Sequence, residues 1–151
     1  MRGCQVLTAA CLFSAALVAA DNPFAGTWKL NTSESKSAPG TAIKEMTVTF
    51  EPVGDQWKRV ATGIDSDGKP FNQNSTIAWD GKDHAIDEPG ITVAVTHVND
   101  RTLNATVKRE GAVIDSIHAV ISKNGKTMTV SEKGQDRNGH KLDNVEVFEK
   151  Q

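Results

Sequence analysis

The sequence contains very little cysteine, and both of its cysteines, Cys4 and Cys11, lie near the N-terminus. The rest of the chain therefore cannot form an internal disulfide, a thiolate metal site or a cysteine nucleophile. An excess of charge of one sign is also lacking, because 17 Lys and Arg stand against 19 Asp and Glu, for a formal net charge of −2. This balance argues against a nucleic-acid-binding protein. With 38% hydrophobic and 24% charged residues, the 151-residue chain is expected to form one globular domain.

Residues 1–20 have the pattern of a secretory signal peptide. A basic start is followed by an uncharged apolar stretch from Cys4 to Ala20 that ends in small residues. We predict cleavage after Ala20, which leaves residues 21–151 as one mature domain that is secreted or periplasmic and not stably inserted in a membrane. Two alternatives are a membrane anchor and lipidation at Cys11. The apolar stretch is short and rich in Ala for a span of about 20 residues, and it continues well past Cys11.

The mature sequence favours β structure. From residue 21 onward it contains 12 Val, 8 Ile and 13 Thr against 3 Leu, and β-branched side chains fit a pleated sheet better than a helix. Turn signals such as Asp80-Gly81 and Asn138-Gly139 recur at short intervals and supply the positive φ angles that tight hairpins need. The expected strands are 24–30, 43–51, 56–63, 69–79, 83–86, 91–98, 101–109, 112–122, 126–133 and 141–149.

Ten consecutive hairpin strands are expected to form an up-and-down antiparallel meander. The alternation that places Met46, Val48 and Phe50 on one face indicates that one side of the sheet is core and the other is wet. Closure into a roughly ten-stranded barrel removes exposed strand edges. A barrel of more than about eight strands also leaves interior space that side chains alone do not fill. The fold class is therefore all-β.

The two ends of the mature sequence resemble a known family. The segment from Phe24 to Asn31, which contains Gly26 and Trp28 as Gly-x-Trp, and the segment from Val145 to Lys150 resemble the opening and closing strands of intracellular fatty-acid-binding proteins. They also resemble the wider lipocalin-like (calycin) superfamily, and the chain is similar to small secreted bacterial lipocalin-like domains. The resemblance implies a lipocalin-like barrel. Gly26 would permit a sharp bend or close approach, and Trp28 would plug one end.

The residues that hold the ligand carboxylate in that family differ in this sequence. The family has an arginine seven residues beyond a strand-turn glycine and an Arg-x-Tyr in the last strand. The matching positions here are His118, counted from Gly111, then Glu146 and Phe148. A carboxylate buried beside Glu146 would meet like-charge repulsion, so capture of a fatty acid through that motif is not expected. The two-helix lid of the family is replaced by a polar loop, residues 32–42.

The expected function is the binding of a small, largely hydrophobic molecule inside the barrel. Side chains on the inward parity are mostly apolar with a few polar ones, as in small-molecule pockets. The expected walls are Phe71, Ile77, Trp79, Val95 and Phe148, and the expected polar groups that orient the ligand are Gln73, His118 and Glu146. Core packing is the alternative role of the aromatic residues. The facing of Trp57 is left open because Arg59 shares its parity.

Catalytic and metal-binding patterns are weak. His97, His118 and Glu146 are metal-ligand types without the usual spacing. Asp115 and Ser116 are neighbours in an expected strand and face opposite sides, which prevents a triad with His118. The sequence therefore predicts neither enzyme activity nor a metal site, and it implies no cofactor.

A function of a different class is the alternative. The barrel would then be a non-enzymatic envelope or extracellular interaction module, including an inhibitor, that grips a protein partner. Its contact surfaces would be the rim loops, residues 31–42 and 80–90.

Overall fold

The structure, a computed structural model, describes residues 22–151. The expected signal peptide and its cleavage site lie outside the described residues. The described chain forms ten strands: β1 (Gly26–Leu30), β2 (Glu45–Val53), β3 (Gln56–Ile64), β4 (Pro70–Ile77), β5 (His84–Ala85), β6 (Ile91–Asn99), β7 (Thr102–Arg109), β8 (Ala112–Ile121), β9 (Thr127–Gln135) and β10 (Lys141–Lys150). Each begins and ends within two residues of the position expected from the sequence. Within residues 22–151, no helix has the length and apolarity that a membrane crossing requires.

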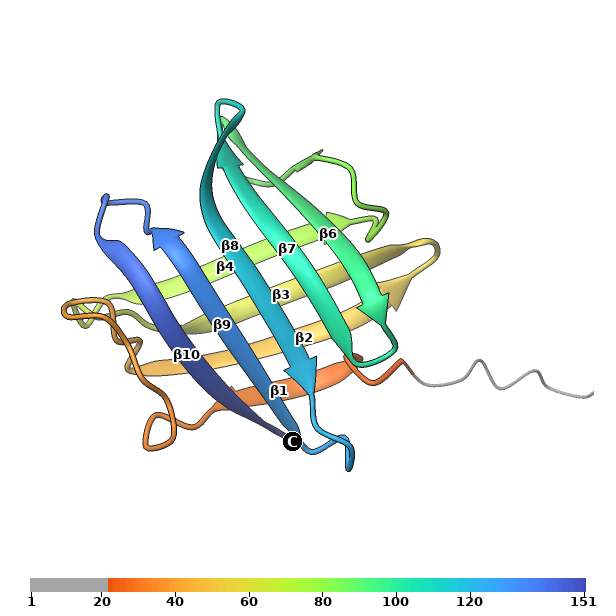
Figure 1. Ribbon diagram of the computed structural model, residues 1–151, viewed down its shortest axis with the longest axis horizontal. Helices are drawn as coiled ribbons and strands as arrows, with labels where there is room; N and C mark the ends of the chain where they lie inside the picture. The colour runs from red at the N-terminus through yellow and green to blue at the C-terminus, as the bar shows by residue number, and fades with distance from the viewer. Residues whose placement is uncertain (1–21) are drawn as a thin grey trace, which may run out of the picture.

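The ten strands form one antiparallel sheet that curls into a nearly closed barrel. The strand order is β4-β3-β2-β1-β10-β9-β8-β7-β6-β5, so β1 pairs with both β2 and β10. Figure 1 shows the layer of β6 to β10 crossing in front of the layer of β1 to β4. The strands β4 and β5 stand at the two ends of this order and do not pair, which leaves a gap in the wall. The prediction of an all-β, up-and-down meander closed into a roughly ten-stranded barrel is confirmed.

One turn design occurs twice and explains two of the hairpins. In the β3–β4 turn, the Asp65 carboxylate accepts hydrogen bonds from backbone N–H groups of the turn, and Gly68 has a φ of 84°. In the β9–β10 turn, Asp136 does the same and Gly139 also has a φ of 84°. A positive φ is sterically easy for glycine alone, so the Asp-to-Gly spacing in the sequence dictates these turns.

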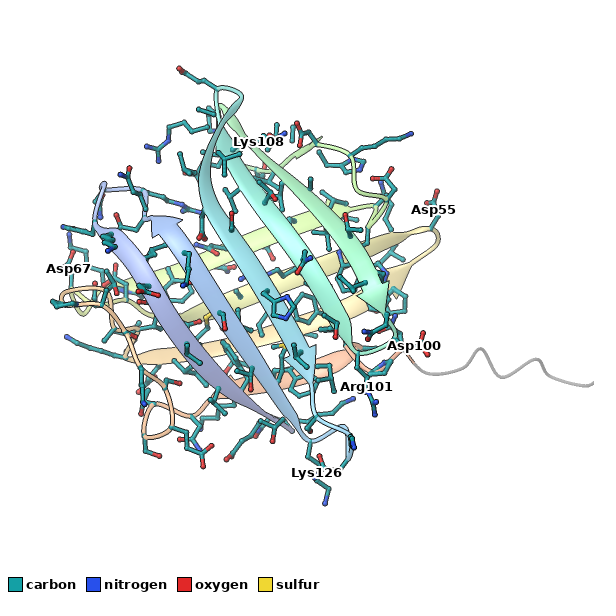
Figure 2. All side chains as sticks on the ribbon, in the orientation of Figure 1. Asp55, Asp67, Asp100, Arg101, Lys108 and Lys126 are labelled. Carbon is teal, nitrogen blue, oxygen red and sulfur yellow. The ribbon has the colours of Figure 1, made fainter. Side chains whose placement is uncertain are left out.

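The barrel has two different ends. The open end carries the connections 31–44, 65–69, 86–90, 110–111 and 136–140, and the closed end carries the others together with residues 22–25. In Figure 2 the labelled Asp67 and Lys108 mark the open end, and Asp55, Asp100 and Lys126 mark the closed end. These charged side chains lie at or near turns, where solvent reaches them.

The closed end holds an aromatic and aliphatic core. Phe24, Trp28 and Phe148 are fully buried or nearly so, and the Trp28 Nε1–H donates to the Phe24 carbonyl oxygen over 2.9 Å. The rings of Trp57 and Trp79 stack with centroids 4.3 Å apart, and Phe24 meets Trp79 edge-on. Trp28 thus occupies the plug position that the sequence predicted, and Trp57, whose facing was open, points inward.

The loop between β1 and β2 contains no helix and is tied to β10. The backbone N–H of Ala38 and the Thr41 hydroxyl both donate to Oδ1 of Asn144, over 2.8 and 3.0 Å. Lys36 pairs with Val145 as an antiparallel bridge. The expected replacement of a helical lid by a loop is confirmed, and this loop extends the wall beside β10.

Gly63 of β3 is predicted to be required for the close pairing of β2 with β3. A Cβ atom at this position would clash with the backbone carbonyl of Glu45, which cannot rotate away as a side chain can. We expect Gly63→Ala to lower the free energy of unfolding by about 2 kcal/mol or more, measured by urea denaturation. Thr62→Val, on the exposed neighbour, is the control and should change it by less than about 0.5 kcal/mol. Equal effects of the two substitutions would contradict the close approach.

Candidate functional site

The inner face of the open half includes several side chains that point inward and are only partly buried. On β4, Phe71, Gln73 and Ser75 are half-buried and alternate with exposed residues. Ile117 of β8 and Val130 of β9 are also partly buried and pack against the core. The core residues of the closed end are by contrast almost fully buried. The inner face of the open half therefore combines apolar and polar groups that remain partly accessible.

Four charged side chains from four strands face this interior. They are Arg59 on β3, Asp115 on β8, Glu132 on β9 and Glu146 on β10. Asp115 and Glu146 are only 7% and 5% exposed, and Arg59 and Glu132 are half-buried. In Figure 1, β3 belongs to the rear layer and β8 to β10 to the front layer, so Arg59 and the three acids come from opposite walls of the barrel.

The charged side chains in this group have few partners. Arg59 Nη1 donates to Gln73 Oε1 over a long 3.4 Å, and Arg59 takes part in none of the five ion pairs within residues 22–151. In the same part of the chain, Asp115 Oδ1 is the one side-chain polar atom that is sealed from solvent and has no hydrogen-bond partner. Because buried polar groups normally have partners, this arrangement is unusual for a purely structural interior.

The environment shifts the protonation of these groups. Burial, helped by repulsion from Glu146 and Asp115, raises the pKa of Glu132 to about 8. Burial also raises the pKa of Glu146 to about 7, although attraction to Arg59 opposes it. The pKa of Asp115 is raised by burial as well. Burial lowers the pKa of Arg59, but a guanidinium stays charged at neutral pH. The interior therefore places a cation near carboxyl groups, two of which, Glu132 and Glu146, exchange protons near neutral pH.

An ion pair spans the open end. Arg137 Nη2 in the β9–β10 turn lies 2.6 Å from the Glu88 carboxylate in the β5–β6 connection. The Arg137 carbonyl accepts a 3.3 Å hydrogen bond from Arg109 at the end of β7. The positive charge of Arg137 also contributes to the lowered pKa of Arg59. The rim and the interior charges therefore interact electrostatically.

Most of the expected binding residues lie on the inner face. Ile77, Val95, Glu146 and Phe148 are buried there, and Phe71 and Gln73 are half-buried. Trp79 belongs to the aromatic cluster of the closed end, where its ring meets Phe24, Phe50, Trp57 and His97. The expected walls and the expected polar groups Gln73 and Glu146 are thus brought to one interior.

His118 is the exception, and its prediction as an inward polar group is wrong. It is exposed on the outer face, where Nδ1 lies 2.6 Å from Oδ1 of Asn104. The cause is a β-bulge in β8. Lys108 pairs with Val113 and Val107 with Asp115, so Ile114 is an extra residue that reverses the facing of everything after it. Without the bulge, His118 would point inward.

Sequence reasoning missed Arg59, Asp115 and Glu132 as interior residues. The signal was present, because Glu132 shares the parity of Met128 and Val130 and both of these are core residues. A charged residue at an inward position is ordinarily assigned to the solvent face. Recognising these residues required giving the alternation more weight than the residue type.

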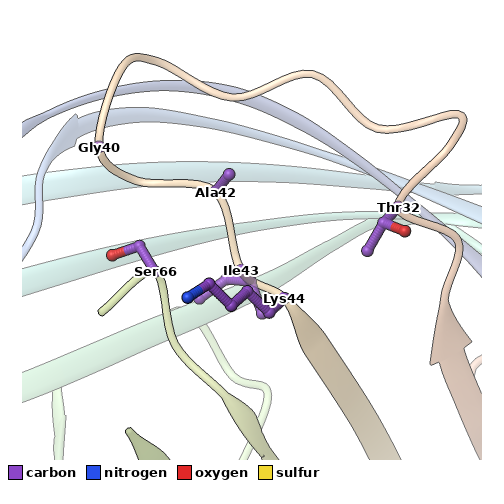
Figure 3. A pocket seen from close by; sticks show the side chains of 6 residues that line it. All are labelled: Thr32, Gly40, Ala42, Ile43, Lys44 and Ser66. Carbon is purple, nitrogen blue, oxygen red and sulfur yellow. The ribbon is translucent and has the colours of Figure 1, made fainter. Parts of the chain in front are cut away.

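The described residues show no metal site, and a surface cleft at the open end lies away from the expected binding residues. No three His, Cys, Asp or Glu side chains within residues 22–151 converge closely enough to hold a metal ion. Figure 3 shows a cleft of about 440 Å³ at the open end, lined by Thr32, Gly40, Ala42, Ile43, Lys44 and Ser66. It lies between the β1–β2 loop and the β3–β4 turn and includes none of the expected binding residues.

Comparisons with known proteins identify the fold. No protein-family model and no curated protein matches the chain. Among solved structures, the chain is similar to a Schistosoma mansoni fatty acid binding protein in complex with arachidonic acid, with 15% identity, a TM-score of 0.57, and coverage of 85% of this chain and 96% of that one. It is also similar to a zebrafish ileal bile acid-binding protein complexed with cholic acid, with 11% identity, a TM-score of 0.55, and coverage of 85% and 99%. The chain therefore shares the ten-stranded barrel fold of these proteins.

The raised pKa values of Glu132 and Glu146 predict that stability falls as the pH rises. Between the ordinary glutamate pKa and about 8, these groups bind more protons in the folded protein than in the unfolded chain. The free energy of unfolding should therefore fall from pH 5 to pH 8, by up to about 1.4 kcal/mol per pH unit for each group. Glu132→Gln should flatten this profile in urea titrations, and Glu51→Gln, on the exposed side of β2, should not. A stability that rises over this interval would contradict the assignment.

Proposed function

We propose that the mature chain is a non-enzymatic protein that binds a small, largely hydrophobic molecule inside its barrel. The observation that carries the proposal is the inner face of the open half. There Phe71, Ile117 and Val130 point inward but remain partly accessible, beside the polar Gln73 and the buried Glu146. Inward side chains that keep some access are available for contact with a ligand, and apolar walls with a few polar groups are typical of ligand sites.

The similar structures support an interior site. Both were solved in complex with small molecules, arachidonic acid in one and cholic acid in the other. At 11% and 15% identity they share the fold with this chain, and their ligands are not transferred to it. The chemistry of the ligand has to be argued from the side chains that line the barrel here.

The proposal includes the location of the protein. The pattern of residues 1–20 favours export and removal of a signal peptide, which leaves a secreted or periplasmic barrel of the kind found in small bacterial lipocalin-like domains. Cysteine is confined to Cys4 and Cys11, so the mature chain would need no disulfide chemistry after export.

An interior site predicts that substitutions on the inner and outer faces of β8 have different effects on ligand binding. A neutral fluorescent probe, N-phenyl-1-naphthylamine, should bind the mature chain saturably, with increased emission. Ile117→Trp fills the interior and should weaken binding by about tenfold or more. Val120→Trp, on the exposed side of the same strand, should change it by less than about twofold. Circular dichroism checks that both variants fold. Equal losses in the two variants, or no saturable binding by the parent chain, would contradict the site.

The signal peptide predicts the start of the exported protein. When the full chain is expressed in a Gram-negative bacterium, intact-mass measurement of the periplasmic fraction should give a chain that begins at Asp21. Ala20→Arg should block processing, because the residue before the cleavage point must be small. A periplasmic product that retains residues 1–20, or one that begins at Cys11, would support the anchor or the lipidation alternative instead.

A further inference from the structure

The interior of the open half contains more hydrogen-bond acceptors and negative charge than the described chain itself can satisfy. Asp115, Glu132 and Glu146 face the same space as a single cation, Arg59. If Arg59 balances one of these carboxylates, two acidic groups remain without a cation from residues 22–151. Isolated carboxylates are costly to bury, so in the free protein these acids retain protons, and only a cation from outside the described chain would stabilise their ionised forms.

Glu146 provides an independent sign that this group comes from outside the chain. It is 5% exposed, and its carboxylate accepts no hydrogen bond from residues 22–151, unlike Asp115, to which the backbone N–H groups of Ser116 and Lys133 lie close. Its oxygens are also not sealed by protein, since Asp115 Oδ1 is the one sealed and unpartnered atom in this part of the chain. Glu146 therefore presents free acceptors to the space inside the barrel.

We propose that the ligand carries an ammonium group on an apolar body, and that Glu146 and Glu132 receive this ammonium inside the barrel. The inference rests on the function proposed above and names the chemical class of its ligand. An ammonium has three N–H donors, no acceptor and one positive charge, which complements a group of carboxylates. The partly accessible apolar side chains Phe71, Ile117 and Val130 would contact the rest of the molecule.

Other polar groups fit this interior less well. A ligand carboxylate would be attracted to Arg59 but repelled by three acids, and Arg59 already uses one donor on Gln73. A neutral hydroxyl could donate to Glu146 but would leave the excess charge in place. A single metal ion is disfavoured because no three ligand side chains converge within residues 22–151. The balance of charge therefore favours an organic cation.

Binding of an ammonium would be linked to proton release. The charged groups that act on Glu132 and Glu146 are Arg59 from β3 and Asp115 from β8, with Arg137 acting on Arg59 from the β9–β10 turn. Since a bound cation favours ionised glutamates, their protons leave when it binds. Affinity for the amine should therefore rise with pH until the free glutamates are ionised, near pH 8.

Three probes with the same tail test the inference. Decylamine, decanol and decanoate are compared by calorimetry, below their micelle concentrations, on the mature chain at pH 6, 7 and 8. At pH 8 decylamine should bind about tenfold or more tightly than decanoate. Its Kd should fall by up to about tenfold per pH unit between pH 6 and 7 for each proton that is released. The Kd of decanol should stay constant over the same range.

Substitutions inside the barrel give the matching test. Glu146→Gln should weaken the binding of decylamine by about tenfold or more and change the Kd of decanol by less than about twofold. Glu149→Gln, an exposed glutamate on the same strand, is the control and should change neither. Arg59→Met removes the competing cation. It should therefore strengthen the binding of decylamine and weaken the binding of decanoate. Opposite responses of this kind are not expected from a general loss of structure.

The outcomes separate this inference from the proposed function. If decanol binds but decylamine shows no preference over decanoate, or if Glu146→Gln leaves decylamine binding unchanged, the ammonium inference is overturned and the interior site stands. If none of the three probes binds, both are overturned.

Discussion

The pairing of β1 with β10 is the contact on which both the stability and the site of this protein depend. It joins opposite ends of the described chain, with Trp28 beside Lys150 and Leu30 beside Phe148. Because β4 and β5 do not pair, loss of this pairing would divide the wall into two separate sheets, β1 to β4 and β5 to β10. Two further strand edges would then be exposed, and such edges invite aggregation. With the pairing of β1 and β10, the alternation of every strand acquires an inside and an outside. Trp28, Leu30 and Phe148 are all buried, so the same contact also anchors the core.

The two halves of the barrel have different physical roles. The closed end is apolar and tightly filled, and its stacked and edge-on aromatic rings supply contacts beyond simple burial of area. The open half contains Arg59, Glu132 and Glu146, and burying such groups opposes folding. The raised pKa values of the two glutamates show how the molecule limits this cost, since a protonated carboxyl group is cheaper to bury than a charged one. Stability from the closed end therefore offsets the cost of burying charged groups in the open half.

The sequence predicted the strands well because turn chemistry and alternation are local properties. Asp65 with Gly68, and Asp136 with Gly139, fix their hairpins through bonds within a few residues. The facing of His118 could not be predicted in the same way, because the bulge at Ile114 is a property of the pairing between β7 and β8. One extra residue reverses the facing of all that follow, since the side-chain period of a strand is two. Local rules therefore predict where strands lie more reliably than which side chains they turn inward.

The charged interior shows why fold similarity and ligand chemistry separate in this barrel. Backbone alternation determines which positions point inward. The geometry of β10 is the same whether the side chain at such a position is a cation or an anion. The resemblance to fatty-acid-binding proteins implies an arginine where this chain has Glu146, while its own interior arginine, Arg59, comes from β3 in the opposite layer. Under the proposed function, a cation on β3 and carboxyl groups on β8, β9 and β10 would reverse the sign of the surface that meets the polar end of a ligand. The apolar walls would still favour an apolar body, and the head group would be selected by the few charged side chains that project inward.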